Sequence, residues 1–85
     1  MYLHLGQETV VRVQDIVGIF DMDNTTISKH TRQFLADAEK AGRVVNVSPE
    51  LPKSFIICRE EDRETVYVSQ ISTATLMKRR KAGIK

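Results

Sequence analysis

The sequence predicts an α+β fold in which a small mixed or antiparallel sheet is packed by one long helix and a short C-terminal helix. Runs of β-branched residues come first, an apolar stripe at helical spacing follows them, and two further β-rich runs come after a glycine. At 85 residues the chain has room for one domain. We place this domain at residues 1–77 and expect a basic tail at 78–85.

Three strands are expected before the helix. Residues 1–5 alternate apolar and polar-tipped side chains up to Gly6, and residues 9–13 and 15–21 are rich in valine and isoleucine. β-branched side chains pack well on a pleated sheet and are less favourable in helices. The first quarter of the chain is therefore predicted to be sheet.

One long helix is expected at residues 25–41. Asp21, Asp23 and Asn24 precede it, and their side-chain oxygens can accept hydrogen bonds from the free N–H groups of a first helical turn. Gly42 can adopt the left-handed conformation that ends a helix. The residues expected to face the core recur at spacings of three and four: Ile27, Thr31, Phe34, Ala38 and Ala41.

Strand character resumes at residues 43–47, after which Pro49 and Pro52 predict an extended loop without ladder hydrogen bonds. Residues 54–58 and 65–69 are both β-rich and close in sequence. They are expected to pair as a hairpin.

The charged segment 59–64 is expected to be the loop of that hairpin, with its acidic side chains in solvent. A last short helix should begin at Ser72, with Leu76 and Met77 packing inward. Residues 78–85 hold five basic groups and no acidic one, and are expected to form a frayed tail.

Composition and motifs argue against several classes of protein. The chain has one cysteine, so it cannot form an internal disulfide, and a reducing cytoplasm is the expected compartment. Neither a signal peptide nor an apolar run long enough to span a membrane is recognisable. The four glycines form no phosphate-binding loop, and the two histidines belong to no metal-ligand pattern. We expect no enzyme activity, no catalytic residues, no metal and no cofactor.

The net charge of +2 is unevenly distributed, since residues 1–77 hold 8 basic and 11 acidic groups while 24–59 is locally basic. A basic face would suit the phosphate backbone of double-stranded DNA. The candidate contacts are Lys29, Arg32, Arg43, Lys53, Lys78, Arg79 and Arg80, with Lys81 beside them. Simpler roles are open for each: a solvated helix face for Lys29 and Arg32, a helix C-terminal cation for Arg43, and a solubilising end for the tail.

A winged helix-turn-helix is one alternative architecture. It would use residues 13–20 as a support helix, 25–41 as the recognition helix and the hairpin at 54–69 as the wing. The valine, isoleucine and glycine content of 13–20 favours a strand instead, and residues 1–12 offer no further helix.

Five segments are informative when taken together and in order: residues 2–6, 15–21, 38–47, 51–57 and 66–76. They resemble the bacterial extracellular matrix regulators of the RemA/RemB family, and the RemB branch in particular. The resemblance implies a small α+β subunit that assembles into a ring-like homo-oligomer and carries DNA on its basic outer surface. It also implies a cytoplasmic, nucleoid-associated regulator of the transcription of biofilm matrix genes.

The sequence departs from this family in one loop. RemA-type chains carry adjacent arginines after the strand that follows the helix, whereas this chain has Leu51 and Pro52 near those positions. Lys53 keeps a positive charge there and Glu50 adds a negative one. An assembly protein that partners a DNA-binding relative, without binding DNA itself, is therefore a second candidate function.

Overall fold

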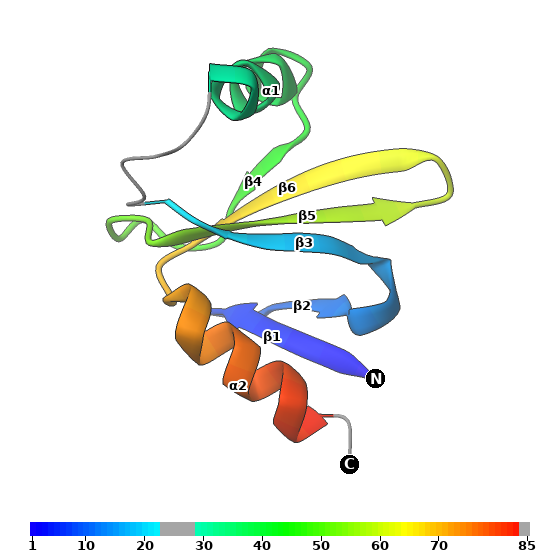
Figure 1. Ribbon diagram of the computed structural model, residues 1–85, viewed down its shortest axis with the longest axis vertical. Helices are drawn as coiled ribbons and strands as arrows, with labels where there is room; N and C mark the ends of the chain where they lie inside the picture. The colour runs from blue at the N-terminus through cyan, green and yellow to red at the C-terminus, as the bar shows by residue number, and fades with distance from the viewer. Residues whose placement is uncertain (23–28, 84–85) are drawn as a thin grey trace.

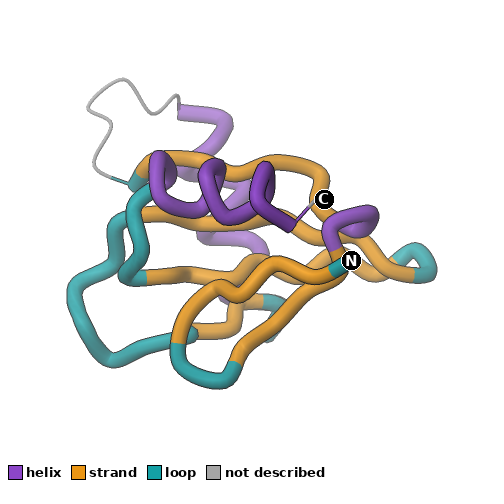
Figure 2. Tube along the Cα trace, turned by 90° about the horizontal axis from the view of Figure 1, so that it is seen from below, coloured by secondary structure: helices purple, strands orange, loops and turns teal. Residues whose placement is uncertain are grey.

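The computed structural model describes residues 1–22 and 29–83, with side chains up to Arg80, and its elements form three layers (Figure 1). Helix α1 covers one face of a four-stranded sheet. A two-stranded sheet and helix α2 lie on the other face, side by side when seen from below (Figure 2). The elements are β1 (Tyr2–Gly6), β2 (Thr9–Arg12), a 3-10 turn (Val13–Asp15), β3 (Ile16–Asp21), α1 (Lys29–Lys40), β4 (Val44–Asn46), β5 (Ser54–Glu60), β6 (Arg63–Ser69) and α2 (Thr73–Gly83).

The predicted α+β class and the positions of the strands are confirmed, but the single sheet is wrong. Within the described residues β1 and β2 pair only with each other, and the larger sheet has the order β3-β5-β6-β4. Its strands are antiparallel except β4, which runs parallel to β6 because α1 carries the chain across the sheet. β3 and β4 are therefore its edge strands.

Neither helix is long, which corrects a second prediction. α1 has 12 residues and α2 has 11 within the described ranges. The predicted residues 25–28, which include Ile27, lie outside the described residues. The winged-helix alternative is wrong, because the stretch proposed as its support helix is a 3-10 turn followed by β3.

Gly42 ends α1 as predicted. Its φ of +73° lies in the left-handed region, its N–H donates to Glu39 O at 3.1 Å, and the N–H of Arg43 donates to Ala38 O at 2.9 Å. This pair of bonds is a Schellman motif, which satisfies carbonyls that a helix end leaves free. Ala41 falls in this turn and is exposed, so its predicted place in the core is wrong.

The β5–β6 hairpin is longer than predicted. Only Glu61 and Asp62 form the turn, both with positive φ (48° and 67°), which suits a two-residue hairpin. The remaining residues of the expected loop belong to the strands because oppositely charged side chains face each other across the ladder. These cross-strand pairs are Arg59 with Glu64 and Glu60 with Arg63.

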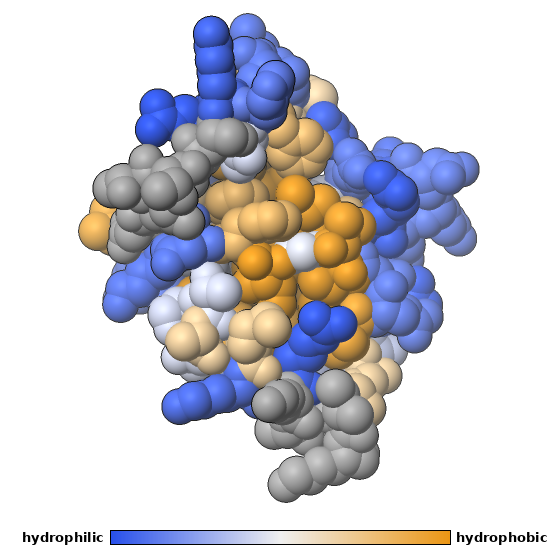
Figure 3. All heavy atoms as spheres, viewed as in Figure 1, coloured by the Kyte–Doolittle hydropathy of each residue, from blue (hydrophilic) through white to orange (hydrophobic). Residues whose placement is uncertain are grey.

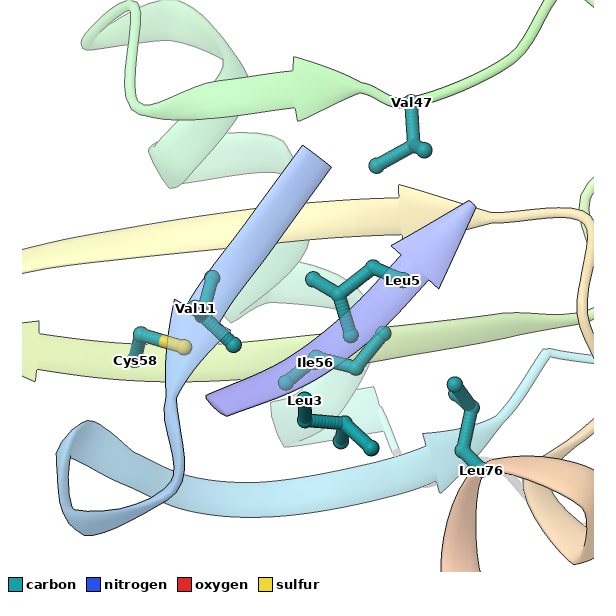
Figure 4. Close-up of a cluster of buried hydrophobic side chains, with 7 residues drawn as sticks. All are labelled: Leu3, Leu5, Val11, Val47, Ile56, Cys58 and Leu76. Carbon is teal, nitrogen blue, oxygen red and sulfur yellow. The ribbon is translucent and has the colours of Figure 1, made fainter. Parts of the chain in front are cut away.

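Each face of the larger sheet has its own core. On the face under α1, Phe55 and Val66 pack with Ala38, and Phe34 and Leu35 border them. On the opposite face, the β1–β2 hairpin and α2 cover β5 (Figure 4). The buried residues there are Leu3, Leu5, Val11, Val47, Ile56, Cys58 and Leu76. Alternation along β5 divides the two cores, since successive strand residues point to opposite faces.

Ser54 and Ser69 face each other across β5 and β6 and are fully buried. The Ser69 hydroxyl donates to Leu5 O at 2.6 Å and accepts the N–H of Ile71 at 3.0 Å. The Ser54 hydroxyl donates to Ile71 O at 2.7 Å. We call this pair the serine clasp, because it ties the end of β1 to the junction between β6 and α2.

Ser72 begins α2 as predicted, because its Oγ accepts the N–H of Thr75 at 3.2 Å. Leu76 is buried as expected, but Met77 is exposed and does not pack inward. The helix also continues to Gly83, although the sequence predicts a tail from Lys78. Lysine and arginine are good helix formers and are favoured near a helix C-terminus, which explains the extension.

Candidate nucleic-acid interface

The structure separates the seven predicted contact residues into three groups. Lys29 and Arg32 on α1 go with Lys53, which directly precedes β5; Arg43 lies before β4, at the opposite end of the larger sheet; the other three residues lie on α2. The two helices are on opposite sides of the sheet (Figure 1). One flat surface therefore does not present all seven.

Three of the candidates define what we call the basic end of the molecule: Lys29, Arg32 and Lys53. All three side chains are exposed. Figure 1 shows that β3 ends, and that α1 and β5 begin, toward the same side of the molecule. The backbone of Lys53 is fixed there, since its N–H donates to Ser69 O and its carbonyl accepts the N–H of Met22, both at 2.9 Å.

The loop before Lys53 carries the departure from the family pattern. Leu51 is 82% exposed and Glu50 is also exposed, so both side chains point into solvent. The Ser48 hydroxyl accepts the N–H of Glu50 at 3.1 Å, which braces the loop locally. A side chain of any size or charge can therefore occupy position 51 without disturbing the core.

Arg43 lies at the end of the larger sheet opposite to Lys53. The sequence predicts no other candidate contact residue at that end. Arg43 is half-buried, and its Nη1 lies 3.8 Å from Glu64 Oε1. Arg59 Nη2 lies 2.6 Å from the other oxygen, Oε2, of the same carboxylate. These three residues line an open hollow with Asp62 and Arg63.

Sequence reasoning missed Arg59 and Arg63 because it placed them in a solvated loop. The pattern of opposite charges in residues 59–64 could have predicted that these residues pair across two strands. A two-residue turn at Glu61 and Asp62 makes Arg59 oppose Glu64, and that register places both arginines on strands.

The α2 group is partly engaged in holding the fold together. Arg79 Nη1 donates to His4 O at 3.2 Å, which links α2 to β1. Arg80 is half-buried and Lys78 is exposed. Lys78 is thus the member of this group most available to a phosphate.

Cys58 is buried. Burial, together with the carboxylates of Asp15 and Glu60, raises the pKa of its thiol to about 11. Burial likewise raises the pKa of Tyr67. Both groups are protonated at neutral pH, so neither is an activated nucleophile.

The described residues can be compared with the requirements of a metal site and of a membrane-spanning helix. Within residues 1–22 and 29–83, no three His, Cys, Asp or Glu side chains gather where they could hold a cation. The helices of the same ranges are too short or too polar to cross a membrane.

Comparison with known proteins places these features in a family context. A family model described as RemA-like, extracellular matrix regulatory protein A-like, matches residues 2–79. The chain is also similar to extracellular matrix regulatory protein B of Bacillus subtilis (strain 168). The two are 37% identical over 79 residues, which cover 93% of this chain and 89% of that protein.

Proposed function

The chain belongs to the RemA-like family of extracellular matrix regulatory proteins, and from this premise we propose that it regulates transcription of biofilm matrix genes by binding DNA as a ring-like homo-oligomer in the cytoplasm. Binding would be to the phosphate backbone of double-stranded DNA. Such contacts position a protein on the duplex and carry no sequence information by themselves.

The observation that carries this proposal is the basic end. Lys29 and Arg32 lie at the start of α1 and Lys53 directly precedes β5; all three are exposed, and α1 and β5 begin toward the same side of the molecule. Each cation that neutralises a phosphate releases a condensed counterion, so several modest contacts add to a salt-dependent affinity. Repetition of the same three groups around a ring would multiply the effect.

Replacing the three residues of the basic end with glutamine should weaken DNA binding. If each contacts one phosphate, the slope of log K against log salt should fall in magnitude by about 2.7 for each subunit that contacts the duplex, and the affinity near 100 mM salt should fall by about tenfold or more. Fluorescence anisotropy of a labelled duplex across a salt series measures both quantities. A triple variant with the slope and affinity of wild type would contradict the proposal.

Two further variants sharpen this test. Arg12→Gln with Lys40→Gln removes two exposed cations outside the basic end, and should change the slope by less than about one. Arg12 suits this role because Asp15 already holds its guanidinium, with Nε 2.9 Å from Oδ2. Leu51→Arg adds an exposed cation near the position where RemA-type chains carry arginines, and should raise the affinity for DNA.

The sheet edge at β3 supports self-association. Among the described strands β3 pairs with β5 alone, and its Val17 and Phe20 are 57% and 42% exposed. Figure 3 shows an apolar area at the level where β3 crosses the view, between the layers of α1 and α2. An unpaired apolar edge strand is a ready template for contact with another chain.

Val17→Lys should therefore reduce the oligomer to a monomer of 9.7 kDa, because a charge at the edge opposes strand pairing. Light scattering coupled to size exclusion measures the mass. Leu51→Lys is the matched control, since it places the same charge on an exposed apolar residue outside β3, and it should leave the mass unchanged. A wild-type chain that is itself monomeric would rule out the ring.

A partner role without DNA binding is the second candidate function. It is favoured by Leu51, an exposed apolar side chain in the loop where the family resemblance leads one to expect arginine. A leucine suits contact with a protein surface better than contact with phosphate. Under this alternative, wild type would show negligible DNA binding at low salt, and Leu51→Arg would create it.

A further inference from the structure

Within the described residues, the larger sheet has two unpaired edges, β3 on one side and β4 on the other. These two edge strands run in the same direction. β3 is antiparallel to β5, β5 is antiparallel to β6, and β6 is parallel to β4. A second copy placed beside the first in the same orientation therefore brings its β4 alongside β3, with the two strands parallel.

Backbone groups at both edges are directed outward. Successive residues of an edge strand direct their N–H and C=O groups alternately toward the neighbouring strand and away from it. The N–H of Met22 donates to the residue before β5, so the backbone groups of Ile19 point away from β5. The N–H of Val47 donates to β6, so those of Val44 and Asn46 point away from β6. Each edge can thus pair with one more strand.

Helix α1 leaves its face of the sheet open on the β3 side. A hollow of about 210 Å³ lies there, lined by residues of β3, β5 and α1 and by none of β6 or β4. Figure 3 shows apolar side chains gathered in the area between α1 and the level of β3. We call this the apolar hollow, and its lining residues are Phe20, His30, Thr31, Phe34, Phe55 and Ile57.

The opposite face of the sheet is open on the β4 side instead. A second hollow, of about 370 Å³, is lined there by residues of β5, β6 and the turn between them, and by none of β3. Val45 of β4 is paired with Tyr67, a lining residue of this hollow, and is 41% exposed. The covering layers therefore leave open the β3 side of one face and the β4 side of the other.

We propose that subunits of the oligomer join head to tail, with β3 of one subunit paired in parallel with β4 of the next. The inference rests on the proposed function in taking the protein as a homo-oligomer, and it names the two surfaces that meet. The subunit that contributes β4 also places its α1 beside the apolar hollow of its neighbour. The neighbour in turn places its β1–β2 layer beside the open β4 side, so both open areas are covered at one contact.

Head-to-tail pairing also agrees with a ring. A ring needs two different surfaces on each subunit, so that every contact is the same and none is left over on closure. Pairing of β3 with β3 would instead close a dimer and leave both β4 edges open. The apolar side chains exposed at the edges, Val17 and Phe20 on β3 and Val45 on β4, would be buried at the same contact.

Val45→Lys tests the β4 edge in combination with Val17→Lys, which places the same charge at β3. Each variant alone should be a monomer of 9.7 kDa, because each lacks one of the two surfaces. An equimolar mixture should form a dimer of twice that mass and nothing larger, since only the β3 edge of one variant and the β4 edge of the other are intact. Light scattering coupled to size exclusion measures the masses, and circular dichroism should show the wild-type fold in both variants.

The outcomes separate the inference from the proposed function. A Val45→Lys variant with the mass of wild type, or two folded monomers that do not combine, would overturn the head-to-tail contact and leave the proposed oligomer and its DNA binding standing. A wild-type monomer would contradict the oligomer of the proposed function, and the inference with it.

Cysteine cross-linking tests the same contact with substitutions close in size to valine. Val17→Cys with Val45→Cys in one chain, treated with a short bis-maleimide, should give covalent multimers whose cross-linked peptides join residues 17 and 45. Neither single variant should cross-link, because equivalent residues of neighbouring subunits lie four strand spacings apart, roughly 19 Å. Native Cys58 is buried and should react slowly. Cross-linking of Val17→Cys alone, or an oligomeric double variant that does not cross-link, would overturn the inference.

Discussion

Phe55→Ala should lower the free energy of unfolding by about 3–5 kcal/mol. Phe55 is 1% exposed and lies at the centre of the core between the larger sheet and α1, where it packs with Ala38 and Val66. Its ring also stacks on Phe20, with centroids 5.0 Å apart. Truncation removes this burial and leaves a cavity that the surrounding strands cannot fill. Urea denaturation followed by circular dichroism measures the change.

Phe20→Ala is the matched control, because it removes the other ring of the same stack. Phe20 is 42% exposed, so its truncation should cost only about 1 kcal/mol. An equal loss for the two variants would mean that the stack, and not the burial of Phe55, stabilises this face. A stability of about 5–10 kcal/mol is ordinary for a small domain, so Phe55→Ala would remove a large part of it.

Ser69→Ala should cost about 2–4 kcal/mol, although it deletes a single oxygen. The hydroxyl bonds two backbone groups, the buried carbonyl of Leu5 and the partly buried N–H of Ile71. Leaving a buried donor or acceptor unsatisfied costs about 1–3 kcal/mol. Thermal and chemical denaturation measure the loss, and hydrogen exchange at the Ile71 amide should accelerate.

Ser54→Ala supplies the comparison within the serine clasp. The Ser54 hydroxyl makes one hydrogen bond within the described residues, to Ile71 O at 2.7 Å, so its loss should cost about half as much. If Ser69→Ala proves no worse than Ser54→Ala, the clasp does not join β1 to the β6–α2 junction in the way described. Both side chains are fully buried, so differences in solvation do not complicate the comparison.

Local features of the sequence predict the elements of this fold well. β-branched runs mark the strands, Gly42 marks the end of α1, and Ser72 marks the start of α2, because each acts through its own backbone or through near neighbours. The orientation of Met77 and the extension of α2 past Lys78 were not predictable in this way. They depend on what packs against the helix, which is set by β1, far away in sequence.

The candidate sites depend even more on contacts between residues that are far apart in the sequence. The sequence singles out Lys29, Arg32 and Lys53 as basic residues, but their placement toward one side follows from the crossing of α1 over the sheet. Arg59 and Arg63 were overlooked because their environment depends on strand register, which a two-residue turn decides. The sequence shows which residues are charged, but which of them become neighbours depends on how the strands pair.

The protonated, buried state of Cys58 has a practical consequence. A thiol whose pKa is about 11 is ionised in roughly one molecule in ten thousand at pH 7, and the β1–β2 hairpin covers it. Alkylating reagents can therefore reach it efficiently only when that hairpin lifts from β5. The rate at which a reagent labels Cys58 therefore reports the rate at which the β1–β2 hairpin separates from β5. Mass spectrometry measures this labelling, and the chain has no other cysteine that could be labelled.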